Sequence, residues 1–423
     1  MAALEHWSRS PRRLWDALGP GVITGAADDD PSGIATYSQA GAQFGYALTW
    51  TVFLTVPFMA AIQIVSASIG WQTRAGLARS IARRFPRPVL HGLLVLLVAA
   101  NTLNIAADLA AMGEALRLAI AGPAVLYALA FGLGCLLAEI LIPYHRYVGY
   151  LKFLTLVLFV YVAAALSLRL PWPQILLAAL LPRLSGGHDW ALTIVAVFGT
   201  TISPYLFFWQ ASQEAEESRL SLRRGRRSAA LPQDLRRISV DTWIGMLFSN
   251  LIAFFIIVTT GATLHVHGIT HIATASQAAQ ALRPFAGALT FGLFAAGIIG
   301  TGLLAVPVLA GSAAYAVADS WGLAGSLELP AGRARGFYAI VATATVAGGA
   351  LVLARVDPIA MLFWTAVVNG LVAVPIMLVM MLLTAGPGRF RALAISRPVK
   401  VLGWLATVMM ALAAGALAWT SVI

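Results

Sequence analysis

Three consecutive aspartates followed by a proline stand inside the first long apolar segment of this chain, in the run Asp28-Asp29-Asp30-Pro31-Ser32-Gly33. Proline removes a backbone donor and glycine loosens the chain, so we expect a helix to break here. Broken helices are tolerated at membrane depth only where they are buried in protein or line a cavity. A carboxylate at such a break is costly, and the run therefore predicts a cation or proton site.

The composition of the chain supports a membrane location for this run. Of the 423 residues, 60% are hydrophobic and 11% are charged, and the mean hydropathy is +0.83. Crossing a bilayer takes roughly 20 apolar residues, and this predicts an all-α polytopic membrane protein. We expect eleven spans, near residues 19–43, 46–70, 89–112, 121–142, 146–169, 190–213, 239–263, 286–317, 336–354, 358–384 and 400–422.

Cysteine content and the amino-terminal sequence exclude two further features. The single cysteine, Cys135, lies in an apolar segment, so no disulfide framework or cysteine-based metal site is possible. Arg9, Arg12 and Arg13 are not followed by a short apolar region with a cleavage site. We therefore expect the first span to be retained, not removed as a signal peptide.

The basic residues are distributed in a way that explains the net charge of +11 without nucleic acid. With residues 1–18 placed in the cytoplasm, 23 of the 28 lysines and arginines fall on that side of the expected spans. The five others are Arg117, Arg169, Arg183, Arg283 and Arg355. This positive-inside bias predicts a multi-pass protein of the cell (inner or plasma) membrane, with its N-terminus cytoplasmic and its C-terminus outside. No obligate protein partner is evident.

Two of the expected spans are interrupted by a proline within a polar patch. The first is the aspartate run, and the second is Thr200-Thr201-Ile202-Ser203-Pro204-Tyr205 in the sixth span. Interrupted helices at matching positions of two halves are typical of an inverted-repeat transporter with its site at the midplane. We expect residues 19–169 to form the first repeat of spans 1–5, residues 190–384 the second repeat of spans 6–10, and residues 400–422 an appended eleventh span.

These motifs resemble the Nramp family of divalent-metal transporters, whose first span breaks at Asp-Pro-Gly-Asn and whose sixth span carries Met-Pro-His. The matching segments are Gly19-Pro20-Gly21, Asp30-Pro31-Ser32-Gly33, Gln39-Ala40-Gly41-Ala42, Gly45-Tyr46, Trp50, Asp108-Leu109-Ala110 and the run from Gly199 to Tyr205. The likeness extends through the tenth span. It implies the leucine-transporter fold, with five-plus-five inverted repeats, alternating access and a metal ion bound between the two breaks.

The departures from the family pattern concern the metal ligands and the proton route. Gly33 stands where the family has an asparagine ligand, and Ser203 where it has a methionine ligand. Residues of the family's proton route are replaced as well: its two sixth-span histidines fall at Tyr205 and Gln210, and its third-span glutamate falls at Ala111. The ninth span also lacks an interior arginine.

Loss of the methionine changes which ions the site favours. A thioether is a soft ligand that favours transition metals, whereas magnesium prefers oxygen and keeps several of its waters. Two shortened side chains leave a wider, oxygen-lined pocket that suits a partly hydrated Mg²⁺. In this respect the chain is similar to the Nramp-related magnesium transporter branch.

The resemblance also implies a set of site residues. Asp30 is the expected anionic ligand, directly or through water, and it also suits the N-cap of the second half-helix. Ala27 and Thr200 match positions that offer backbone carbonyls. Alternatives stay open for the others: metal contact or simple packing for Ser203 and Tyr205, a coordinating water or a helix–helix hydrogen bond for Asn369, and a pathway carboxylate or a structural hydrogen bond for Asp108.

Three further clusters of polar residues are weaker candidates. Of Asp28 and Asp29, we expect one to face a vestibule and the other to cap or pair. Glu214, Glu216 and Glu217 form either an acidic inner vestibule or, more simply, offset the neighbouring arginines. The spacing of His265, His267 and His271 suggests a metal site, but no carboxylate lies among them, and a solvated loop is favoured over a zinc site.

The sequence as a whole predicts a secondary transporter for divalent cations, Mg²⁺ foremost and Mn²⁺ second, without proton coupling or a cofactor. Proton-coupled transport of manganese or iron, or sodium-coupled transport of an organic solute on the same fold, stays open. An enzyme is not expected, because no His-Glu-x-x-His, Gly-x-Ser-x-Gly or paired intramembrane aspartate motif is present. A metal sensor, which would bind the ion without transporting it, also stays open.

Overall fold

The computed structural model describes residues 20–142, 146, 155–182, 186–223, 231–385, 390 and 393–422, and over these residues it is helical with no strand. Nine helices in this part of the chain are long and apolar enough to cross a membrane. The first expected span is split into two short helices. Of the fifth, only η2 (Thr155–Leu158) and α9 (Phe159–Ser167) are described. The expected cytoplasmic N-terminus, residues 1–18, lies outside the described residues.

The long unbroken helices follow the expected spans, with ends that differ by a few residues. Two differ more: the third-span helix runs on to Ile120, and the seventh-span helix already begins at Leu231. Their bounds are α4 (Thr49–Thr73), α6 (Arg87–Ile120), α7 (Ala124–Leu141), α13 (Leu231–Thr263), α16 (Thr290–Trp321), α17 (Arg335–Val352), α18 (Pro358–Thr384) and α19 (Arg397–Thr420). Shorter elements join them, namely α5 (Leu77–Ala82), α10 (Trp172–Leu180), η4 (His265–His267), α14 (Ala275–Gln280), α15 (Arg283–Ala286) and η5 (Gly287–Leu289).

Both interrupted spans break at their prolines. The first consists of α2 (Pro20–Asp28) and α3 (Pro31–Phe44), and the sixth of α11 (His188–Thr201) and α12 (Pro204–Arg223). Proline is well suited to the first turn of a helix, where its missing N–H has no partner to lose. Pro31 and Pro204 therefore start the second half-helix of each pair.

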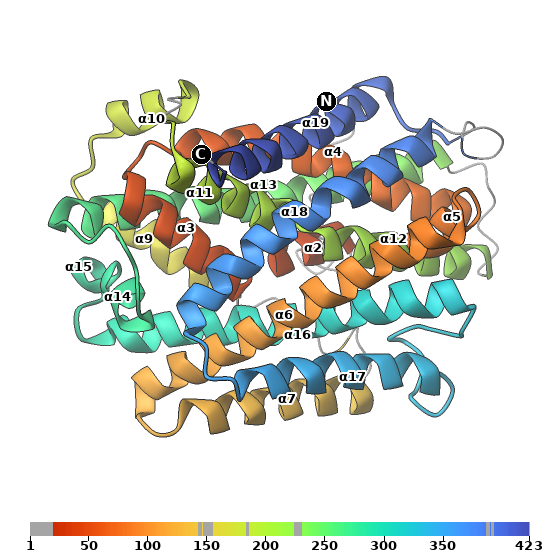
Figure 1. Cartoon of the computed structure of the whole chain (residues 1–423), viewed down its shortest axis with the longest axis horizontal. Coiled ribbons are helices and arrows are strands. Elements are labelled where there is room, and N and C mark those ends of the chain that lie inside the picture. Colours follow the sequence, from red (N-terminus) through yellow and green to blue (C-terminus); the bar gives the residue numbers. More distant parts are fainter. Residues whose placement is uncertain are drawn as a thin grey trace, which may run out of the picture.

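The broken helices occupy the centre of the bundle, and the unbroken ones surround them (Figure 1). α13 packs along both α2 and α3, while α4 packs on α12 and α18 packs on α11. On the far side of α6 and α16, α7 and α17 lie together at one edge of the molecule, and α19 lies at the opposite edge (Figure 1). The centre is thus shielded on every side by helices.

Small residues allow several of these helices to touch backbone to backbone. A Cβ atom at Gly25 of α2 would meet the backbone of Gly245 in α13, and one at Gly199 of α11 would meet the backbone of Ala366 and Gly370 in α18. Membrane helices commonly use glycine for such close approach, because lipid offers no hydrophobic drive for their association. These contacts fix where the two broken helices sit.

Candidate metal centre

The connection between α2 and α3 is formed by Asp29 and Asp30, and it is wholly buried. Asp28, Asp29 and Asp30 are each 1% exposed. Asp30 is the N-cap of α3: its carboxylate accepts a hydrogen bond from the Gly33 amide at 2.8 Å. This leaves carboxylate oxygen capacity for a further partner, so capping and metal coordination by Asp30 are compatible.

The second connection, between α11 and α12, is formed by Ile202 and Ser203. The Ser203 hydroxyl is hydrogen-bonded back onto its own helix end, 3.0 Å from the Gly199 carbonyl and 2.8 Å from the Thr200 carbonyl. The Thr200 carbonyl, an expected metal ligand, therefore already accepts one hydrogen bond. A carbonyl has two lone pairs, so one acceptor site remains for an ion.

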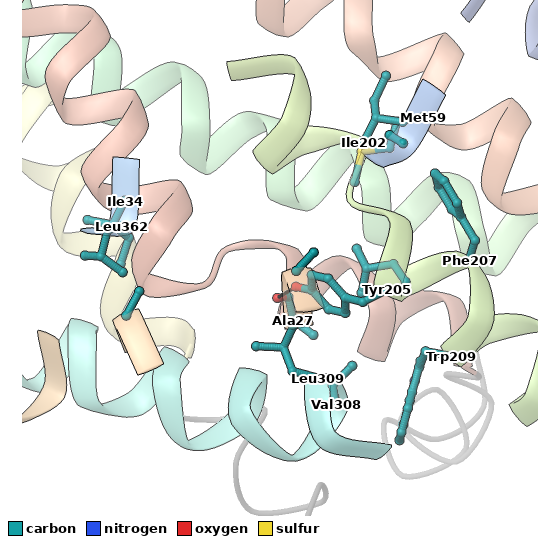
Figure 2. Packing of buried hydrophobic residues seen from close by; sticks show 14 of the residues in the cluster. Ala27, Ile34, Met59, Ile202, Tyr205, Phe207, Trp209, Val308, Leu309 and Leu362 are labelled. Atoms are coloured by element: carbon teal, nitrogen blue, oxygen red, sulfur yellow. Dashed lines mark hydrogen bonds between the residues drawn. The ribbon is translucent and has the colours of Figure 1, made fainter. Parts of the chain in front are cut away.

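Side chains link the two breaks directly to each other. The Tyr205 hydroxyl donates to the Ala27 carbonyl at 2.9 Å, and Figure 2 shows its ring reaching across from α12 to the end of α2. On the α3 side, the Tyr37 and Thr201 hydroxyls are 3.0 Å apart, and those of Ser32 and Thr200 are 3.4 Å apart. Of the expected ligand positions, Ala27 and Tyr205 are therefore in direct contact, and Thr200 contacts the first break through Ser32.

The missing side chain at Gly33 has been partly compensated by a close approach of α3. A Cβ atom at this position would lie 3.3 Å from the Thr200 hydroxyl and 3.4 Å from the Asp28 carbonyl oxygen. The expectation of a wider pocket thus needs a qualification at residue 33. Space that an asparagine would fill has been taken up in part by Thr200.

Two expected site residues approach from helices outside the broken pair. Asp108 of α6 is fully buried, and its charge is close enough to interact with that of Asp30. Asn369 of α18 is 1% exposed. Among the described residues, neither the carboxylate of Asp108 nor the amide of Asn369 has a hydrogen-bond partner. The structural hydrogen bond considered for each of them is therefore not formed within the described part of the chain.

Two polar residues near the breaks are missing from the residues that the sequence singles out. Ser249 of α13 donates to Asp28 at 2.6 Å and lies 3.1 Å from Asp29. Asn104 of α6, one turn before Asp108, is fully buried, and its amide has no partner among the described residues. In the sequence, each of them is only a polar residue within an apolar run. Many serines and asparagines with a purely structural role have the same pattern, so it does not indicate a site.

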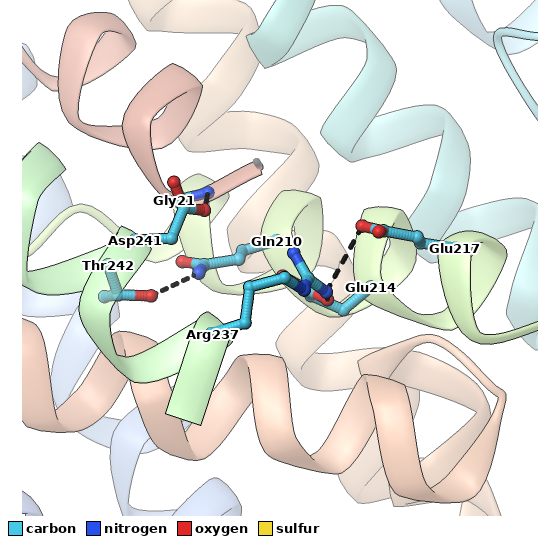
Figure 3. Close-up of polar contacts among 7 residues, drawn as sticks. All are labelled: Gly21, Gln210, Glu214, Glu217, Arg237, Asp241 and Thr242. Atoms are coloured by element: carbon cyan, nitrogen blue, oxygen red, sulfur yellow. Dashed lines mark hydrogen bonds and ion pairs between the residues drawn. The ribbon is translucent and has the colours of Figure 1, made fainter. Parts of the chain in front are cut away.

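A partly buried polar network lies at the start of α2 (Figure 3). The Asp241 carboxylate accepts from the Gly21 amide at 2.7 Å, and Gln210 donates to the Thr242 hydroxyl at 2.9 Å. Nearby, Arg237 lies 3.2 Å from the Glu214 carboxylate and 3.4 Å from that of Glu217. Glu214 and Glu217 therefore pair with Arg237 of α13, whereas Glu216 accepts a hydrogen bond from the Ser326 hydroxyl at 3.0 Å.

A cavity of about 390 Å³ opens on the other side, along α3 from Ala35 towards its end. Its polar lining is formed by Gln39, Gln43, Asp189, Thr193, His271 and Asp357. Near this cavity, Ile34 of α3 and Leu362 of α18 lie close to each other and line the same small apolar pocket (Figure 2).

The histidines between α13 and α14 make separate contacts. His265 is bound through Nδ1 to the Ala42 carbonyl at 2.8 Å, and His267 to the Thr263 carbonyl at 2.5 Å. Within the described part of the chain, no three His, Cys, Asp or Glu side chains converge into a metal-holding group. An ion at the breaks would accordingly be held by few carboxylates, with hydroxyl, carbonyl and water oxygens completing its shell.

Comparison with known proteins gives consistent matches along the chain. The profile of the family described as Nramp, natural resistance-associated macrophage protein-like, matches residues 21–420. A divalent metal cation transporter MntH of Verminephrobacter eiseniae is 28% identical over 310 residues, which are 71% of this chain and 68% of that protein. Another from Erwinia tasmaniensis is 31% identical over 310 residues, which are 70% and 72% of the two chains.

Solved structures show the same fold at low sequence identity. The Eremococcus coleocola manganese transporter, in complex with an aromatic bis-isothiourea compound, superposes with a TM-score of 0.76 at 18% identity, over 95% of this chain and 86% of that one. Mhp1, a nucleobase-cation-symport-1 family transporter, gives 0.57 at 14% identity, over 96% and 92%. The leucine-transporter architecture is thereby established.

Proposed function

This chain belongs to the Nramp family, and on that premise we propose that it carries divalent metal cations across a membrane. The observation that supports this most is the meeting of the two helix breaks, where the Tyr205 hydroxyl binds the Ala27 carbonyl and the Ser32 and Thr200 hydroxyls are 3.4 Å apart, next to the buried Asp30. Hard cations bind oxygen ligands of this kind. A transporter, and not an enzyme, is the activity to which family membership assigns the chain.

Mg²⁺ is the proposed principal ion, with Mn²⁺ as a second. Ser203 replaces the soft thioether of the family pattern, so the site has lost the ligand that discriminates against magnesium. The unpartnered amide of Asn369 and carboxylate of Asp108 suit a larger, hydrated ion, because they can hold its outer waters. Magnesium gives up its waters reluctantly and is usually bound with several of them.

Movement of the ion is proposed to follow alternating access between two inverted repeats, residues 19–169 and 190–384. The cavity beside α3 is the entrance from outside, and the Ile34–Leu362 contact closes it above the centre. The Asp241–Gly21 and Gln210–Thr242 contacts close the cytoplasmic side. This assignment places the N-terminus in the cytoplasm of the cell membrane and the C-terminus outside, as the positive-inside bias predicts.

The proposal is tested by ion uptake into proteoliposomes, with Mg²⁺, Mn²⁺, Ca²⁺ and Fe²⁺ measured in parallel. We expect Mg²⁺ uptake by the wild type and a loss of at least about tenfold in Asp30→Ala, since removal of an anionic ligand costs well over 1.4 kcal/mol of ion binding. Asp234→Ala, at the start of α13, is the matched control and should transport normally. Near-normal uptake by Asp30→Ala would place the site elsewhere.

A further inference from the structure

Four carboxylates are buried in and near the α2–α3 connection. Asp28, Asp29 and Asp30 on the α2–α3 connection and Asp108 on α6 are each 1% exposed or less. Their charges interact with one another, and none of the four takes part in an ion pair within the described part of the chain. An uncompensated buried charge is strongly destabilising. If all four carboxylates were ionised, one divalent ion at Asp30 would balance only half of their charge.

Ser249 shows where the rest of the charge is concentrated. Its hydroxyl oxygen lies 2.6 Å from Asp28 Oδ2 and 3.1 Å from Asp29 Oδ1. A hydroxyl carries a single proton, so it can donate to only one of two ionised carboxylates at a time. Three oxygens therefore converge on this point with one proton among them. A cation between them would satisfy all three.

The opposite oxygens of the same two carboxylates are also available. Asp28 Oδ1 and Asp29 Oδ2 are buried and have no hydrogen-bond partner among the described residues. Both residues stand at the carboxyl-terminal end of α2, where the helix dipole is negative and favours a cation over an anion. The helix dipole and the carboxylates favour a positive ion beside Ser249, and the unpartnered oxygens show that the hydrogen-bonding capacity of the two side chains is not satisfied by protein groups in the described part of the chain.

We propose that Asp28, Asp29 and Ser249 form a second divalent-cation site, adjacent to the one at Asp30 and towards α13. Two carboxylates and a hydroxyl, completed by water, match the way magnesium is usually held in proteins. Two divalent ions would neutralise the four buried carboxylates. Repulsion between two adjacent ions favours the release of one of them, as in multi-site ion pathways. The second site is then an intermediate binding position between Asp30 and the cytoplasm. This inference rests on the proposed function.

The number of ions bound per chain tests it. Purified protein in nanodiscs is equilibrated with Mn²⁺ as the probe, and bound Mn²⁺ is counted by equilibrium dialysis with electron paramagnetic resonance. We expect two Mn²⁺ per chain in the wild type, with spectral broadening from their mutual proximity. In Asp28→Asn/Asp29→Asn we expect one, without the broadening. Excess Mg²⁺ should displace both ions from the wild type.

Two further variants separate loss of a site from loss of structure. Ser249→Ala keeps both carboxylates and should weaken only the second Mn²⁺, by about tenfold. Asp234→Asn lies about four helical turns before Ser249 on α13 and should still bind two. Retention of one Mn²⁺ by the double variant serves as its folding control, and its complete loss would overturn the separation of the two sites.

One Mn²⁺ per chain in the wild type, or two in the double variant, would equally overturn the second site. The first result means that protons balance the excess charge. Neither result touches the proposed function, which fails instead if the wild type shows no flux or if Asp30→Ala transports normally.

Discussion

At the scale of single residues, the proposed ion selectivity depends on two positions where the side chain is shorter than in the family pattern. Ser203 no longer offers a sulfur ligand, and its hydroxyl binds the Gly199 and Thr200 carbonyls instead. Gly33 lets α3 approach Thr200 closely. Both changes leave an oxygen environment around Asp30, which suits a hard ion that keeps part of its water.

Restoring the family pattern with Gly33→Asn and Ser203→Met should shift the preference from Mg²⁺ towards Mn²⁺, because it adds a soft ligand. We expect a change of about tenfold in the ratio of the two uptake rates, which corresponds to about 1.4 kcal/mol. Gly33→Asn/Ser203→Leu is the matched control, since leucine has a similar size but no sulfur. If both double variants fold and show the same ratio, ligand softness does not set the selectivity.

The residues at the breaks were predictable from the sequence because polar groups and prolines are rare in membrane spans. Tyr205 does contact Ala27, and Thr200 does lie beside Ser32 of the first break, while metal binding by these residues and Asp30 stays a prediction. Ser249 could not be predicted from the sequence as a partner of Asp28. Its position follows from the packing of α13 against α2, and a single serine in an apolar run does not indicate which helix it faces. The orientation of the Ser203 hydroxyl and the close approach at Gly33 depend on sub-ångström packing, which sequence patterns do not specify.

At the scale of elements, α13 holds α2 along its length through residues spaced four apart. Asp241 binds the Gly21 amide, Gly245 touches Gly25, and Ser249 binds Asp28. Positions four apart lie on one face of a helix. The hydrophobic pattern predicted both helices but not which faces meet, because an all-apolar helix gives no directional signal.

Gly245→Ala should disturb this contact, since its methyl group would meet the Gly21 carbonyl. Overpacking of this kind costs about 1–3 kcal/mol, so we expect a lower melting temperature in detergent and reduced uptake. Gly292→Ala, in α16, is the control because a Cβ there has open space around it. Gly292→Ala should leave the melting temperature unchanged or raise it slightly. Equal melting temperatures for the two variants would contradict tight packing at Gly245.

At the scale of the whole molecule, the helices and their order followed from hydropathy, and the breaks from their prolines. Proton coupling is a property at the same scale, because it needs a continuous titratable route from the metal site to the other side of the membrane. Here the family's route positions are Tyr205, Gln210 and Ala111. Tyrosine titrates far above neutral pH, and glutamine and alanine do not titrate. The Gln210 amide is bound to Thr242.

We therefore expect Mg²⁺ uptake without acidification of the vesicle interior. Uptake should increase with an interior-negative potential, which is worth roughly 2.3 kcal/mol per charge per 100 mV. A pH-sensitive dye trapped in the liposomes makes the measurement, with the membrane potential clamped by valinomycin and potassium as a control. Acidification that depends on Mg²⁺ and persists under the clamp would reveal a proton route other than the three family positions.

The backbone contacts between helices have a consequence for how this protein tolerates genetic variation. At Gly25, Gly70, Gly199 and Gly245 the added methyl group of an alanine would enter the backbone of a neighbouring helix. Chemically mild substitutions at these positions would thus be as harmful as the loss of a charged ligand. In a scan of all single-residue variants, the inactivating substitutions would therefore fall at these helix–helix contacts as well as along the ion pathway.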